Sequence, residues 1–411
     1  MEFVEPSQGD MLLGAFRVVS GIKGVTVLIH APVGCHWGVN FIERLSGINT
    51  NSTISALRER NVIFGGEYNL RKAVEIILKR RKCGYIVLLI GSVPSIIGED
   101  VEGALSSVRG NFHYISLDCG GFRGKMWEGY ESCLAELSKW MEPSPSMKRG
   151  NRPLVNLLGF QQDVIRAQAN ENEIRRILSM AGIELNAVLP PRSVNELKRA
   201  ARADLNVVLG YGIGLAKEME RKLGIPYYFF NLHPYGLSGT EEFISTICKK
   251  LGLDDVDRKL QREKDKMFEL LRKAHLYLPS LYGVPAAISA DSPSALGISR
   301  FLSRELGMKI ELVHITSSSH DGAGELKDIC KDVFEEDSWN KFVNLLNKKE
   351  VKLIFGTDLE RVISQKKNIP FIPFSYPAMS RIALTSSPYL GFMGVLTLVE
   401  IMVNLALDHK L

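Results

Sequence analysis

The chain has 411 residues, of which 45% are hydrophobic and 24% are charged, and it contains 36 glycines. This composition is typical of a globular protein with two or three domains and excludes a fibrous, repetitive or disordered chain. Because the net charge is only +5 and acidic residues are mixed with the basic ones, we expect no nucleic-acid binding, although an acidic partner surface is compatible with this balance.

The start of the chain and the cysteines indicate the compartment. No basic segment followed by an apolar one precedes the first predicted strand, so no secretory signal is expected. The cysteines form no C-x-x-C pair and no zinc-type spacing, which favours a reducing, cytoplasmic setting. The apolar stretch 395–407 is short for a membrane span and contains Glu400 and Asn404, so we expect a buried core helix and no membrane contact.

Short runs rich in β-branched residues alternate with amphipathic helical patterns, which is typical of parallel α/β units. The first set has predicted strands at 25–29, 85–90 and 113–117 and predicted helices at 69–80 and 97–107. The polar, proline-rich stretch 143–153 then predicts a domain boundary.

Two further sets follow this boundary. Strands at 155–158, 184–188, 205–209 and 227–230 alternate with helices at 171–180 and 213–223, and a charged connecting helix is predicted at 260–275. The last set has strands at 286–289, 310–314 and 351–355, a helix at 294–306 and the C-terminal helix. We therefore expect an α/β protein with three Rossmann-like domains, each a parallel sheet flanked by helices, over 1–148, 149–279 and 280–411.

The common phosphate-binding loops are missing. No G-x-G-x-x-G follows the first strand, and no G-x-x-x-x-G-K-[ST] occurs in the chain. Gly210-Tyr-Gly-Ile-Gly214 follows a strand but lacks the later glycine of the dinucleotide motif. We therefore expect this chain to bind neither ATP nor a dinucleotide through these loops.

Cys35 stands out by its position at the end of His30-Ala-Pro-Val-Gly-Cys35, where a predicted strand breaks at Pro-Val-Gly and the next side chain is expected to point outward. As a thiolate, and flanked by His36 and Trp37, it could bind iron. Alternatively it is a buried thiol, as free cysteines often are. The other five cysteines are interpreted as core residues: Cys83, Cys119, Cys133, Cys248 and Cys330.

Several strings, in their order along the chain, resemble nitrogenase component 1 proteins. They are His30-Ala-Pro-Val-Gly-Cys35, Asn61-Val-Ile-Phe-Gly-Gly-Glu67, Ile97-Gly-Glu-Asp100 and Cys119-Gly-Gly-Phe-Arg-Gly124, and similar strings continue to Gly391-Phe-Met-Gly394. The superfamily contains nitrogenase, its cofactor-assembly scaffold, the dark protochlorophyllide and chlorophyllide reductases, and the reductive cyclase that builds the nickel tetrapyrrole coenzyme of methanogens. Its members have three Rossmann-like domains, which agrees with the pattern above.

The resemblance implies an iron-sulfur cluster between subunits, with Cys35 as a ligand. Three cysteines are usual in each subunit, but here the other two positions hold Gly9 or Asp10 and Ser92. Since a cubane 4Fe-4S cluster takes four ligands, a paralogous subunit or a second copy of this chain would complete it. The pattern is similar to that of the dark protochlorophyllide reductase component that gives a single cysteine from this turn, and Ser92 or Asp10 could add an oxygen ligand or have only a structural role.

The same resemblance implies the activity. The position 16 residues before Gly224-Ile-Pro226, where nitrogenase has a cofactor-binding cysteine, holds Val208, so the chain resembles the beta-type, non-cofactor subunits. A reductase of this kind takes electrons from a separate iron-protein ATPase, which uses the ATP, and reduces a tetrapyrrole or another unsaturated small molecule. The alternative is a cofactor-assembly scaffold or a non-catalytic structural partner.

Two histidines follow predicted strands, namely His233 in Asn231-Leu-His-Pro-Tyr235 and His320 in a polar loop. Ligands of α/β proteins bind beyond strand ends, and a histidine there is suited to general acid catalysis because it titrates near neutral pH. We therefore predict both as substrate-pocket residues, although each could instead be simply solvated.

Overall fold

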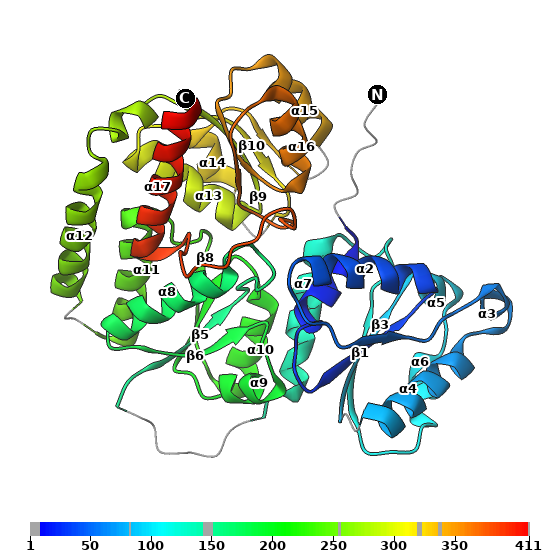
Figure 1. Cartoon of the computed structure of the whole chain (residues 1–411). Helices are drawn as coiled ribbons and strands as arrows, with labels where there is room; N and C mark the ends of the chain where they lie inside the picture. Colours follow the sequence, from blue (N-terminus) through cyan, green and yellow to red (C-terminus); the bar gives the residue numbers. More distant parts are fainter. Residues whose placement is uncertain are drawn as a thin grey trace.

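The computed structural model describes residues 9–81, 84–142, 151–253, 256–318, 323–335 and 339–409. It contains three parallel β-sheets, one after another along the chain, each flanked by helices (Figure 1). The predicted α/β architecture of three Rossmann-like units is therefore confirmed, whereas the domain boundaries stay predictions.

The first sheet has the strand order β2-β1-β3-β4. β1 is buried along its whole length because the sheet is covered on both faces, which explains its continuous apolar run. The strands are β1 (Val25–His30), β2 (Ser52–Ile54), β3 (Tyr85–Ile90) and β4 (His113–Asp118). The helices are α1 (Met11–Val19), α2 (Val33–Leu45), α3 (Glu59–Phe64), α4 (Glu67–Arg81), α5 (Ser92–Ile97), α6 (Val101–Ser106) and α7 (Met126–Glu136), followed by a 3-10 turn (Leu137–Trp140).

The predicted helix at 97–107 is wrong at its start. α5 ends at Ile97 because Gly98 takes the left-handed conformation, with a φ of 68°. A separate helix, α6, then begins after Asp100, whose side chain accepts a hydrogen bond from the Gly103 N–H at 2.9 Å. In this unit, α1, α2, α3, α7 and β2 were not among the predicted elements.

α1 and α7 pack with their backbones in contact. A Cβ atom at Gly14 would lie 1.7 Å from the Met126 carbonyl oxygen, and one at Gly129 would lie 2.0 Å from that of Met11. Glycine is therefore required at both positions. The contact fixes the start of α1, where Asp10 lies, beside the loop that leads into α7.

The second sheet has the order β6-β5-β7-β8, and the third has the order β11-β10-β9-β12-β13. The second unit contains β5 (Leu154–Leu158), α8 (Ala167–Met180), β6 (Glu184–Leu189), α9 (Val194–Ala200), β7 (Leu205–Leu209), α10 (Ile213–Leu223), β8 (Tyr227–Phe230), α11 (Gly236–Leu251) and α12 (Asp257–Leu271). Two 3-10 turns (Arg272–Ala274 and Leu278–Leu281) connect it to the third. That unit contains β9 (Pro285–Ala290), α13 (Ser292–Arg300), a π-helical turn (Phe301–Glu305), β10 (Lys309–Ile315), α14 (Ala323–Ile329), β11 (Val333–Phe334), α15 (Trp339–Lys348), β12 (Leu353–Gly356), α16 (Asp358–Lys367), β13 (Phe371–Pro373) and α17 (Gly391–His409).

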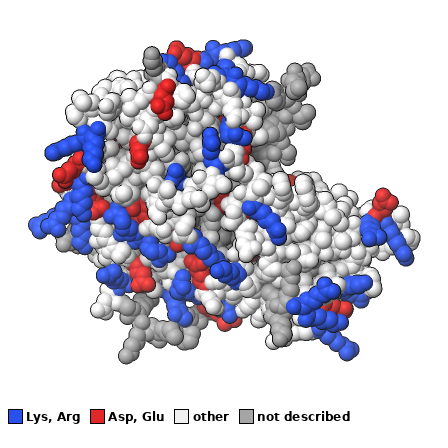
Figure 2. Space-filling view, in the orientation of Figure 1, with Lys and Arg blue, Asp and Glu red and all other residues white. Residues whose placement is uncertain are grey.

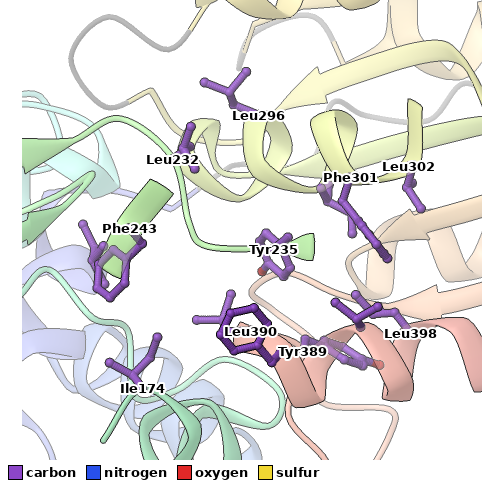
Figure 3. Close-up of a cluster of buried hydrophobic side chains, with 14 of the residues drawn as sticks. Ile174, Leu232, Tyr235, Phe243, Leu296, Phe301, Leu302, Tyr389, Leu390 and Leu398 are labelled. Carbon is purple, nitrogen blue, oxygen red and sulfur yellow. The ribbon is translucent and has the colours of Figure 1, made fainter. Parts of the chain in front are cut away.

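One continuous hydrophobic core joins the second and third sheets, and α17 is part of it. Figure 3 shows Leu398 of α17 in this core with Tyr389, Phe301 and, from α8, Ile174. Within the described part of the chain, α17 is the one helix whose length and apolar composition would suit a membrane span, but half of its most apolar stretch is buried inside the protein. The predicted core helix is therefore confirmed, and it is longer than 395–407.

Candidate functional site

Cys35 lies in the first turn of α2, directly after β1 and the turn at Pro32. Its side chain is half-buried. Burial raises the pKa of the thiol, and the carboxylate of Asp10 raises it further. The free protein therefore holds a protonated Cys35 at neutral pH, so a metal that binds it must displace the proton.

The structure brings the two other predicted positions, Asp10 and Ser92, to the same region. Asp10 caps α1 by accepting a hydrogen bond from the Leu13 N–H at 3.1 Å, and the Ser92 hydroxyl accepts one from the Gly121 N–H at 2.8 Å. A Cβ atom built on Gly121 would lie 3.3 Å from Asp10 Oδ2 and 3.4 Å from Ser92 Oγ. Asp10, whose carboxylate also raises the pKa of Cys35, is thus close to both other predicted positions.

Three side chains of this region carry atoms that can bind a metal: those of Cys35, Asp10 and Ser92. Across the described ranges, no three His, Cys, Asp or Glu side chains lie close enough together to hold a metal ion. A cubane iron-sulfur cluster takes four ligands, mostly thiolates. Cys35 would offer one of them from a partly open position, and Asp10 and Ser92 would offer oxygen atoms, although each also has a structural hydrogen bond.

The prediction of core cysteines is confirmed for four of the five. Each is buried, and burial raises the pKa of each thiol. These residues are Cys119, Cys133, Cys248 and Cys330. Cys83 lies outside the described residues.

A buried polar hub lies behind the Cys35 turn. The His30 ring contacts Glu99 Oε2 through Nε2 at 2.5 Å and Ser55 Oγ through Nδ1 at 2.7 Å. The other oxygen of Glu99 accepts a hydrogen bond from the Gly66 N–H at 2.7 Å. His30, Gly66 and Glu99 belong to three of the strings that carry the family resemblance, so the hub joins the strings in space. In the sequence, the histidine and the glutamate each stand beside an apolar run. Nothing in the sequence indicates that the two side chains pair with each other.

The surface beside Cys35 is apolar. Trp37 and Phe41 of α2 are exposed, and their rings stack at a centroid distance of 5.1 Å. Figure 2 shows few charged side chains over α2. Exposed apolar patches of this kind mark interaction sites. We call this surface the Cys35 face and define it by the exposed apolar side chains of α2: Val33, Trp37 and Phe41.

His233 is buried. It lines a cavity of about 20 Å³ together with Tyr235, Asp291 and Ser294, which is room for about one water molecule. Its Nδ1 lies 3.0 Å from Ser294 Oγ, and its Nε2 makes no well-formed hydrogen bond. Burial lowers the pKa of His233, and the Asp291 carboxylate opposes this only in part, so the ring is neutral. His320, the other predicted histidine, lies outside the described residues.

A larger groove of about 580 Å³ opens where the three units meet. We call it the α2–α8 groove. It lies between the end of α2, the loop and first turn that start α8, and the segment 381–386, which belongs to the long connection that runs in front of the third sheet and α8 in Figure 1. Sequence patterns did not indicate it because its walls come from distant segments.

Arg17 ties the three units together beneath this groove. Its Nε donates to Asp163 Oδ2 at 2.5 Å, and its Nη2 donates to Gln161 Oε1 at 2.6 Å. The guanidinium lies 3.7 Å from the centre of the Tyr376 ring. Gln161 in turn donates to Asp291 Oδ2 at 2.9 Å, which connects this junction to the His233 cavity.

Glu43, on the same helix as Cys35, is fully buried in this junction. It accepts a hydrogen bond from the Tyr376 hydroxyl at 3.0 Å, and the Ser20 hydroxyl lies 3.4 Å from its other oxygen. Burial raises the pKa of Glu43 to about 8, and the nearby Asp163 carboxylate adds to this effect. The carboxyl group is therefore mostly protonated at neutral pH.

The matches to known proteins cover nearly the whole chain. The family model described as nitrogenase component 1 type oxidoreductase matches residues 11–407. The B subunit of light-independent protochlorophyllide reductase from Chlorokybus atmophyticus is 27% identical, over 96% of this chain and 82% of that protein, and the one from Chaetosphaeridium globosum is 25% identical over the same shares. The structure titled "Nitrogenase Cp1 at pH 6.5" has the same fold, with a TM-score of 0.83 at 21% identity over 99% of this chain and 94% of that one. Because the family model spans nearly the whole chain, the predicted resemblance is confirmed, and this chain belongs to the nitrogenase component 1 type oxidoreductases.

Proposed function

We propose that this chain is one subunit of a two-component, ATP-dependent reductase and that Cys35 gives one ligand to a 4Fe-4S cluster shared between subunits. Electrons come from a separate iron-protein ATPase, which uses the ATP, and the complex works in the cytoplasm. The substrate is a tetrapyrrole or another unsaturated small molecule. The names of the protochlorophyllide reductase relatives support this substrate class.

The observation that carries the proposal is the position of Cys35 at an exposed apolar face. A partner that covers Trp37, Phe41 and their neighbours would also remove the Cys35 thiol from water. Exclusion of water and hydrogen bonds around the ligands help to set the reduction potential of such a group. When bound, the cluster would supply single-electron transfer.

The residues of this chain would hold and orient that group. The hub of His30 and Glu99 fixes the end of β1, so the Cys35 turn starts from a rigid base. The α1–α7 contact fixes Asp10 beside it. A paralogous subunit with more cysteines is the preferred partner, since a second copy of this chain would leave half of the ligands to oxygen atoms from Asp10 or Ser92.

The alternative function is a cofactor-assembly scaffold or a non-catalytic structural partner. Val208, at the position of the cofactor-binding cysteine, is buried and has no ligand atom. This disfavours a scaffold that holds its cofactor at this position.

Iron content tests the proposal. Purified anaerobically with its partner subunit, the protein should contain about four irons per interfacial cluster. Cys35→Ala should remove the iron and its broad visible absorbance, whereas Cys248→Ala, a change in the core of α11, should leave both. Unchanged iron in the Cys35→Ala protein would contradict the proposal, and it would favour a structural partner that contributes no ligand.

A further inference from the structure

We propose that an apolar pocket between α12 and α17 binds a small amphiphile, namely a medium-chain carboxylate whose alkyl chain enters the pocket and whose head group stays at its open side. We call it the α12–α17 pocket. It is formed by the second and third units, and Figure 1 shows α12 on the side of the molecule away from α2 and Cys35. The proposal is therefore independent of the proposed function.

The floor of the pocket belongs to the main hydrophobic core. Phe301, Val395 and Val399 line the pocket, and each is at most 2% exposed. Figure 3 shows Phe301 pointing toward α17. The pocket has a volume of about 290 Å³, close to the lower end of the range of small-molecule sites, which are mostly lined by apolar side chains.

The sides of the pocket are apolar but still partly in contact with water. Partly exposed leucines come from four segments: Leu237, Leu271, Leu278 and Leu306. Phe268 of α12 also lines the pocket and is 54% exposed. An alkyl chain that covers these side chains removes apolar surface from water on both partners, which favours binding.

A π-helical turn forms one side of the pocket. The turn Phe301–Glu305 follows α13, and π-helical turns frequently occur at functional sites. Its last residue, Glu305, accepts hydrogen bonds from the N–H groups of Leu237 at 2.8 Å and Ser238 at 3.0 Å, at the start of α11. These bonds hold the turn in place, so this side exists before a ligand binds.

The charges at the open side favour an anionic head group. Arg272 and His275 line the pocket and are exposed, and His275 Nδ1 donates to the Arg272 carbonyl oxygen at 2.6 Å. The Arg272 side chain forms no ion pair with another described residue. The one carboxylate among the residues that line the pocket, that of Glu305, is already bonded to the start of α11. A carboxylate head group would therefore find a guanidinium available for charge-assisted hydrogen bonds.

The experiment measures binding of decanoate to the full-length chain by titration calorimetry, below the concentration at which decanoate forms micelles. Octanoate is the matched ligand with a shorter chain, and decanol is the matched ligand without charge. Arg272→Gln and Phe268→Ser are the pocket variants. Their controls are Arg258→Gln, about 20 Å away at the other end of α12, and Phe64→Ser on α3. All four positions are exposed, so each variant should fold.

We expect decanoate to bind about tenfold more tightly than octanoate, because two more methylene groups are buried. Arg272→Gln should weaken binding of decanoate about tenfold, as for the loss of one charge-assisted hydrogen bond, and leave decanol unchanged. Phe268→Ser should weaken both ligands, and the two controls should change neither. Equal affinities for decanoate and octanoate, unchanged binding by Arg272→Gln, or an equal loss in the controls would overturn the proposal.

Two further measurements separate the pocket from an interface. The iron-containing complex with the partner subunit should bind decanoate as tightly as the chain alone, and loss of binding there would show that a partner covers the pocket. Vesicles of anionic phospholipid should not sediment the chain. If they do so through Phe268 while soluble decanoate does not bind, this surface docks on a membrane and the proposal is wrong.

Discussion

Glu43→Gln should make the protein more stable above neutral pH. The carboxyl group of Glu43 has a pKa of about 8 in the folded chain, against an ordinary value of 4.5 that we take for the unfolded chain. Below pH 4.5 both states are protonated, so the group has no effect. Between these two values only the unfolded state releases the proton, and stability is therefore lost as the pH rises.

The size of this loss follows from the two pKa values. Between the two pKa values, each pH unit lowers the free energy of unfolding by about 1.4 kcal/mol. The carboxyl group therefore destabilises the fold by about 3 kcal/mol at pH 7 and by at most about 5 kcal/mol above pH 8. Glutamine keeps an oxygen for the Tyr376 hydroxyl and an N–H₂ for Ser20, so the variant loses the titration and little else.

Urea unfolding of the wild type and Glu43→Gln, followed by fluorescence between pH 5 and 9, measures the difference. The midpoints should nearly coincide at pH 5, separate as the pH rises and reach a constant difference above pH 8, with the variant more stable. Glu400→Gln, an exposed position on α17, is the control for loss of one negative charge. A difference that does not change with pH, or a variant that is less stable at pH 8, would refute the reasoning.

Two further changes test the frame around Cys35. Glu99→Gln alters the buried hydrogen bonds that Glu99 makes with His30 and with the Gly66 N–H, and it should cost about 1–3 kcal/mol. The unfolding temperature and the bound iron should both decrease, while Glu102→Gln, on the exposed surface of α6, should change neither. Gly14→Ala forces a Cβ atom against the Met126 carbonyl and should cost about 1–3 kcal/mol or more. The matched change Gly38→Ala, where no atom lies within 4 Å, should be neutral or slightly stabilising in a thermal scan, and equal effects of the two alanines would show that α1 and α7 can move apart.

The strands were the most predictable part of the fold. β1, β3 and β7 are covered on both faces, so each consists mostly of apolar residues, which is visible in the sequence. Helix boundaries were harder to predict, because Gly98 ends α5 through its backbone conformation, which the apolar pattern does not encode. α2 was missed because its first turns present glycines and exposed aromatic side chains instead of an amphipathic pattern.

The candidate site was predictable only where its residues are close together in the sequence. The position of Cys35 after a strand could be inferred from six consecutive residues, and the structure brings Asp10 and Ser92 together at Gly121. The pairing of Arg17 with Asp163 joins residues 146 positions apart, and no short pattern contains both. His233 follows a strand as expected, but Ser294 of the third unit packs over it, which only the tertiary structure can show.

α2 is a stiff rod of 13 residues, about 20 Å long. Its first turn carries Cys35 on the exposed face, and its last residue, Leu45, forms part of one wall of the α2–α8 groove. Glu43, close to that end, is buried where the three units meet. Because Glu43 lies two residues before Leu45 and is held in the buried junction, a displacement of the Cys35 end would leave the groove wall nearly fixed. The helix therefore separates the two surfaces mechanically.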